Sequence, residues 1–221
     1  METATTIQPG VLPGLGIKSI YPDITGMSIP PSADCKLPAG DLNTTQNGWR
    51  LFKESHSLAS LWKLFKDIKV ISFCEWTNLA HATDTWDGLL SDVIRPLEGK
   101  DRMFIFQLGD VRSKKFFEVD EILDIISDFS MHGRVSVVLD KQEADNLSEL
   151  LHGKSISVTD ELRYNPGSDY RYDAIFQTMH IDQLLISVDD SILVHQTNRQ
   201  FELPGNATDG KEAAIQAAIH L

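Results

Sequence analysis

The 221-residue chain has little cysteine and no long apolar run, and each absence excludes a class of protein. Cys35 and Cys74 are its only cysteines, too few for a disulfide framework and too far apart for a zinc motif. No segment approaches the roughly 18 consecutive apolar residues that a membrane span needs. The N-terminus lacks the basic and apolar regions of a signal peptide. We therefore expect a cytoplasmic protein with no membrane span, no metal site and no cofactor.

Positive charge is also scarce. Thirty-two acidic residues face 20 basic ones, which gives a net charge of −12, and no run of four or more Lys or Arg occurs. Such a chain is repelled by nucleic acid backbones and by anionic lipid, so we expect no direct binding to nucleic acid. The composition is 42% apolar and 24% charged, which is typical of a globular protein with a buried core.

The first 47 residues differ from the rest of the chain. They contain six of the nine prolines and five glycines, which disfavour regular structure. Apolar residues are nevertheless scattered through them, which is unlike a fully solvated linker. We interpret residues 1–47 as an arm that lies across its own domain or binds a protein partner, including a second copy of the chain.

Residues 48–221 predict a single α/β domain. The expected strands are short and apolar, and they alternate with segments of helical periodicity. The strands are expected at residues 69–75, 103–108, 134–140 and 155–158, followed by a strand pair within 179–198 that turns at Asp189 and Asp190. The helices are expected at residues 58–65, 86–97, 119–129, 144–151 and 211–221, with residues 160–172 as a loop. The pattern predicts three layers, with a mainly parallel sheet and a C-terminal antiparallel strand pair.

The strand pair carries a family resemblance. Its segment begins with His180 and ends with Thr197 and Asn198, and two helix–glycine–strand units precede it, at residues 118–140 and 150–158. This order resembles one half of a phospholipase D-like protein, where the strand pair carries H-x-K-x4-D and G-S/T-x-N. The resemblance implies a histidine nucleophile, a lysine that holds phosphate and an aspartate that orients the histidine.

The lysine of that motif is missing here. With Asp189 as the aspartate, Asp182 takes the histidine's place and Leu184 the lysine's. With His180 as the histidine, Asp182 takes the lysine's place instead and Ser187 the aspartate's. A carboxylate repels phosphate, so both alignments predict a lost or altered chemistry.

Two hypotheses follow from this defect. The first is a non-catalytic binding, assembly or regulatory protein on a degenerate phospholipase D-like fold. The alternative is a phosphodiesterase or nuclease in which a partner subunit supplies the missing cation. Its catalytic residues would be His180 or His195 with Asp189 and Asn198.

Three further patterns allow a structural and a functional interpretation. The segment from Trp76 to Trp86, with His81 and Asp84, follows a strand as a ligand-binding loop would, or its tryptophans pack on the sheet. Carboxylates at strand ends could bind Mg²⁺, or they reflect the preference of Asp for turns: Glu75, Asp110, Asp140, Asp189 and Asp190. Residues 205–211 fit G-x-x-x-x-G-K, but Glu212 replaces the required Ser or Thr, which indicates an ordinary loop before a helix.

Overall fold

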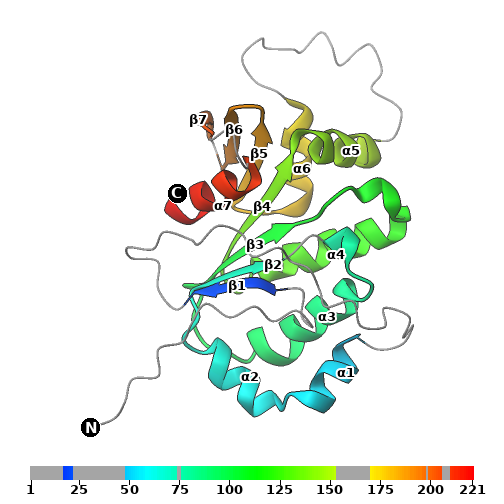
Figure 1. Ribbon diagram of the computed structural model, residues 1–221, viewed down its shortest axis with the longest axis vertical. Helices are drawn as coiled ribbons and strands as arrows, with labels where there is room; N and C mark the ends of the chain where they lie inside the picture. Colours follow the sequence, from blue (N-terminus) through cyan, green and yellow to red (C-terminus); the bar gives the residue numbers. More distant parts are fainter. Residues whose placement is uncertain (1–16, 22–47, 74–75, 153–169, 198, 206–209) are drawn as a thin grey trace.

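The computed structural model describes residues 17–21, 48–73, 76–152, 170–197, 199–205 and 210–221. Both cysteines, Glu75, Asn198 and the strand expected at residues 155–158 lie outside them. The described part confirms the α/β class, with helices packed on a central sheet (Figure 1).

One seven-stranded sheet runs through the described residues, and its strands follow the order of the chain. The four strands β2 to β5 are parallel to one another, and β1, β6 and β7 join antiparallel at the two edges. The strands are β1 (Ile17–Tyr21), β2 (Val70–Phe73), β3 (Met103–Gln107), β4 (Arg134–Asp140), β5 (Gln183–Val188), β6 (Ser191–Gln196) and β7 (Arg199–Pro204).

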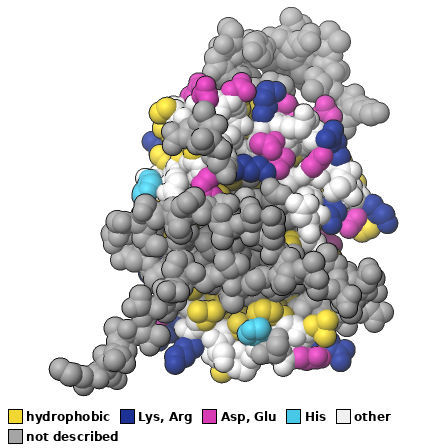
Figure 2. Space-filling model, in the orientation of Figure 1, with side chains coloured by type: hydrophobic (Ala, Val, Ile, Leu, Met, Phe, Trp, Pro, Cys, Tyr) yellow, Lys and Arg dark blue, Asp and Glu magenta, His cyan; other side chains and the backbone are white. Residues whose placement is uncertain are grey.

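The helices fill the connections between these strands. The α-helices are α1 (Gly48–Ser55), α2 (Leu58–Phe65), α3 (Ala82–Leu89), α4 (Phe116–Phe129), α5 (Lys141–His152), α6 (Tyr170–Met179) and α7 (Gly210–His220). Three short turns accompany them: η2 (Trp76–Asn78), η3 (Leu90–Ile94) and η4 (Val111–Ser113). In the upper part of the molecule, charged side chains of both signs are interspersed on the face that Figure 2 shows.

The sequential strand order decides where the helices lie. Every crossover from β2 to β5 advances in the same direction, and a right-handed crossover then puts its helix on the same face each time. Helices α3 to α6 accordingly share one apolar core, whereas α7 packs on the opposite face. The described sheet therefore has three layers, but its parallel part has no reversal of strand order and so lacks the crevice that forms at such a switch point.

Aromatic rings fill the larger core. Phe73 of β2 stacks on Phe106 of β3 at a centroid distance of 4.4 Å. The Trp86 ring from α3 and the Phe129 ring from α4 lie 5.4 and 5.2 Å from Phe106. All four side chains are fully buried. Tilted and edge-on ring pairs add specific contacts to the burial itself, so this cluster fixes both helices against the parallel strands.

A π-helical turn anchors the first two helices. It is η3, where backbone bonds such as Arg95 N to Leu90 O span five residues. Asp92 within it accepts hydrogen bonds from the indole of Trp49 in α1 at 2.7 Å and from Lys53 at 2.8 Å. Its carbonyl accepts another from the indole of Trp62 in α2 at 2.8 Å. One residue thus holds both helices to the end of α3.

Some expected elements differ from the structure. Helix α3 begins at Ala82 rather than Trp86, while α1, α6 and β7 were not expected, and residues 170–172 of the expected loop begin α6. Residues 17–21 of the expected arm form β1 and pair with β2, so this part of the arm lies on its own domain. The hairpin at Asp189 and Asp190 and the helix after Ser57 are confirmed, and Ser57 Oγ accepts from Ser60 N as an N-cap at 3.2 Å.

In the described parts of the chain, no helix is long and apolar enough to cross a membrane.

Truncating Phe106 tests the role of the aromatic cluster. We expect Phe106→Ala to lower the free energy of unfolding by about 3–5 kcal/mol, because the cavity lies among rings that cannot collapse into it. Met131→Ala is the matched control: its side chain is 61% exposed, and the change should stay within about 0.5 kcal/mol. Urea unfolding followed by tryptophan fluorescence measures both, and equal effects would contradict the assignment.

Candidate functional site at the carboxyl edge of the sheet

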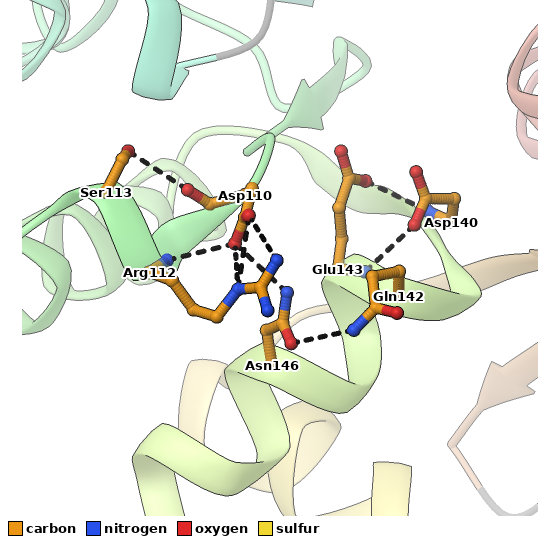
Figure 3. A network of polar contacts seen from close by, with 7 residues as sticks. All are labelled: Asp110, Arg112, Ser113, Asp140, Gln142, Glu143 and Asn146. Carbon is orange, nitrogen blue, oxygen red and sulfur yellow. Dashed lines mark hydrogen bonds and ion pairs between the residues drawn. The ribbon is translucent and has the colours of Figure 1, made fainter.

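Polar side chains gather where the parallel strands end, and they come mainly from the segments after β3 and β4. Figure 3 shows this carboxyl-edge network, which comprises Asp110, Arg112, Ser113, Asp140, Gln142, Glu143 and Asn146. Ligands of open α/β sheets bind at this edge, so the network is the candidate functional site.

Asp110 and Arg112 form a two-pronged ion pair. The guanidinium donates from Nε to Oδ1 at 3.0 Å and from Nη2 to Oδ2 at 2.7 Å. The Arg112 backbone N–H donates to Oδ1 as well, at 3.1 Å, because Asp110 caps the η4 turn. These bonds lower the pKa of Asp110 to about 2. The carboxylate is therefore ionised, and both of its oxygens accept from Arg112.

A reciprocal cap joins β4 to α5. Asp140 Oδ1 accepts from the Glu143 backbone N–H, and Glu143 Oε2 accepts from the Asp140 backbone N–H, each at 2.9 Å. This is a capping box with Asp in the N-cap position. On the next turn of α5, Asn146 donates to Asp110 Oδ1 at 3.0 Å, so the strand ends of β3 and β4 are linked through the helix.

Glu143 also holds the C-terminal helix. Lys211, in the first turn of α7, donates to Glu143 Oε1 at 2.5 Å and lies 3.7 Å from Asp140. The Glu143 side chain is 8% exposed and that of Lys211 21%. Burial raises the pKa of Glu143, and the hydrogen bond from Lys211 opposes that rise. The pair thus ties α7 on one face of the sheet to α5 on the other.

These groups are committed to holding the chain together. Each carboxylate has a partner on a neighbouring segment, and the capping atoms are occupied by backbone N–H groups. Within the described residues, no group of three or more His, Cys, Asp or Glu side chains could hold a metal ion. Asp110 and Asp140 act as caps of η4 and α5. Of the two interpretations of the strand-end carboxylates, these contacts favour the preference of Asp for turns over Mg²⁺ binding.

The two histidines lie in different surroundings. His195 on β6 is buried, and its Nε2 accepts a hydrogen bond from the Gln200 amide at 3.1 Å. The ring of Tyr172 from α6 meets it edge-on at 6.2 Å. His180 is exposed in the turn between α6 and β5, at a φ of 49°. The partner of His195 across the strands is Leu184, so the two histidines do not face each other.

Asp189 lies far from both histidines. It occupies the β5–β6 turn with a φ of 48°, whereas His180 precedes the start of β5. Leu184 and Asp189 are five residues apart on the chain, so Asp189 lies about 16 Å along the strand from the level of His195. The structure therefore does not bring the candidate catalytic residues together, and Asn198 lies outside the described part.

The expected binding loop is built into the fold. Trp76 is 2% exposed and its indole donates to Thr83 Oγ1 at 2.9 Å, while Trp86 belongs to the aromatic core. Asp84 accepts from the Trp49 backbone N–H at 2.8 Å and so caps α1. His81 packs against Gly48: a Cβ added at Gly48 would lie only 2.5 Å from the Cβ of His81. These contacts favour the packing interpretation of the loop.

One feature of this edge was not singled out from the sequence. We call residues Arg112 to Phe117 the basic-aromatic segment. Phe116 and Phe117 are 57% and 61% exposed, and the Lys115 ammonium lies 5.6 Å from the Phe117 ring centre. The Lys114 ammonium lies 5.2 Å from the Trp76 ring centre. The sequence feature that could have indicated this segment is the run Lys-Lys-Phe-Phe, which stands at the start of an amphipathic helix in an otherwise acidic chain.

Comparison with protein families, with curated proteins and with solved structures found no match for this chain. The resemblance to a phospholipase D-like half therefore stays a prediction.

Removing Lys211 tests the link between α5 and α7. We expect Lys211→Met to lower the free energy of unfolding by about 2 kcal/mol at pH 7, less than for a fully buried pair because Lys211 keeps some solvent contact. The loss should shrink as the pH falls toward 5. A raised pKa means that Glu143 favours folding when protonated, and that contribution is lost as the pH rises through its folded pKa.

Two variants control this experiment, which urea unfolding at several pH values measures. Adding Glu143→Gln to Lys211→Met should restore part of the stability, because no unpaired charge then remains buried. Lys141→Met removes a more exposed pair with Asp145 and should cost at most about 1 kcal/mol. A pH-independent loss in Lys211→Met would contradict the proposed role of Glu143.

Asp110 gives the opposite dependence on pH. Its lowered pKa stabilises the folded state above the ordinary value of about 4, and this contribution is lost as the pH falls toward about 2. We expect Asp110→Asn to be less stable than wild type at pH 6 and the difference to narrow at pH 3. Urea midpoints at the two pH values decide it; a difference that widens in acid would be inconsistent with the Arg112 pair.

Proposed function

We propose that the protein is a non-catalytic binding or assembly protein that acts through its basic-aromatic segment. The observation that carries the proposal is the exposure of Phe116 and Phe117, adjacent to each other and next to Lys115. Aromatic side chains are enriched at protein interfaces, and the lysines beside these two give the site a positive charge in a chain whose net charge is −12. A cytoplasmic setting and descent from a phospholipase D-like fold remain part of this proposal.

The arrangement of the polar groups supports the same conclusion. The carboxyl-edge network bonds within itself, and the parallel strands wind in one direction without a switch-point crevice. The phosphodiesterase alternative requires a histidine, Asp189 and a cation in one place. His180 and Asp189 stand at opposite ends of β5, which counts against this alternative.

An assay of phosphodiester hydrolysis tests the non-catalytic proposal. We expect no turnover of bis(p-nitrophenyl) phosphate above the buffer rate, with or without Mg²⁺, for wild type, His180→Ala and His195→Gln. Turnover by wild type that either substitution abolishes would show a working site and overturn the proposal. Urea unfolding of the three proteins checks that a lost signal is not lost folding, because His195 is buried.

A further inference from the structure

The outer face of α4 carries opposite charges at its two ends. Lys114 and Lys115 immediately precede the helix and Phe116 and Phe117 begin it. Toward the C-terminus, the exposed positions continue at intervals of three and four residues, so they lie on one face. They are Asp120, Glu121, Asp124 and Asp128. At the right-hand margin of Figure 2, basic, acidic and apolar side chains lie together where Figure 1 places the start of α4.

This charge order is unfavourable for an isolated helix. The N-terminus of a helix favours negative charge and the C-terminus positive charge. Here two lysines flank the N-terminus, and the last turn has no basic residue. Arg95 reaches Asp128 at 3.4 Å, but in the described part of the chain no ion pair engages Lys114, Lys115 or Asp124. The backbone at the helix start is itself satisfied, because Glu118 in the first turn accepts the Lys115 N–H at 3.0 Å. Within the described residues, the two lysines and Asp124 are left without an opposite charge in an ion pair, and such unpaired charges are available to a partner.

An antiparallel copy of the same helix supplies opposite charges for these side chains. It places its acidic half beside the lysines and opposes the two helix dipoles. From the symmetry, a two-fold axis close to Phe117 brings the phenylalanines of both copies together at the centre. Lys115 then faces the partner's Asp120, and Lys114 faces the partner's Glu121. Such a self-complementary patch is what an isologous dimer requires.

We propose that the basic-aromatic segment and the first half of α4, from Arg112 to Asp124, form the contact surface of a two-fold homodimer. This proposal rests on the proposed function and names the partner of that surface. One helix face buries less than the roughly 800 Å² per partner of a standard interface. The dimer is therefore weak and concentration-dependent, and salt weakens it by screening the charge pairs.

Mass measurement on the full chain tests the dimer. By light scattering after size-exclusion chromatography, wild type should approach twice the chain mass of 24.7 kDa as its concentration rises. Phe117→Ser should weaken association at least about tenfold, as loss of a central aromatic contact does. Because Phe117 is mostly exposed, the urea midpoint of this variant should match wild type. The double variant Lys63→Glu with Lys100→Glu controls for net charge, because both lysines are exposed and lie outside α4. When both proteins are measured in high salt, this variant should dimerise no more weakly than wild type.

A charge-swap experiment tests the geometry itself. The variant Lys114→Glu with Lys115→Glu and the variant Asp120→Lys with Glu121→Lys should each stay monomeric, because like charges then meet. Mixed in equal amounts, they should form a heterodimer, since every contact across the axis is again between opposite charges. Dimerisation of the mixture supports the surface and its antiparallel arrangement.

Other outcomes overturn the proposal. A wild type that stays monomeric at every concentration removes the homodimer, as does a dimer that Phe117→Ser and the charge reversals leave unchanged. A monomer that binds vesicles containing phosphatidylserine assigns the segment to a lipid surface instead. None of these results would produce phosphodiester turnover, so failure of the dimer is distinguishable from failure of the non-catalytic proposal.

Discussion

The stacked pair of Phe73 and Phe106 is the contact on which the arrangement of the domain depends. These rings project from adjacent parallel strands toward the same face, and Trp86 and Phe129 pack against them from α3 and α4. Dense burial of this kind tolerates little rearrangement. It fixes the register of β2 against β3 and sets both helices on one face. The tryptophan that the sequence offered as a ligand contact is therefore needed inside the fold.

The carboxyl edge shows how the same residue types can serve structure instead of chemistry. Its acids cap η4 and α5, and its two cations neutralise them at short range. The exception is Lys114 to Phe117 in the basic-aromatic segment: its phenylalanines are exposed, and its lysines precede the N-terminus of α4. The hydrogen bonds of the network explain its residues, whereas the two exposed phenylalanines remain available to a partner.

Short apolar runs were enough to predict the strands β2 to β6, and apolar residues at helical spacing predicted α2 and α4. Helix α5 was predicted from the segment before Gly153 and α7 from its alanine-rich composition. Helix α6 was missed although Tyr172, Ile175 and Met179 are spaced as on one helix face. Strand β7 is mostly exposed, and only Phe201 and Leu203 alternate with polar residues in it, which is too short a pattern to indicate a strand. The sequence predicted where the candidate site lies, at the strand ends, but not which contacts its residues make. Which carboxylates become caps depends on partners from distant segments, such as Lys211 for Glu143, and those contacts exist only after folding.

The order of the strands has a consequence for how the chain acquires its structure. Each strand pairs with the strand that precedes it in the sequence, from β1 to β7. A growing chain can therefore add every new strand to an edge that already exists, and no early segment has to wait for a distant one. Synthesis from the N-terminus delivers the strands in the order of assembly. Helix α7, held by Lys211, closes the second face after the seven strands of the described sheet have been made.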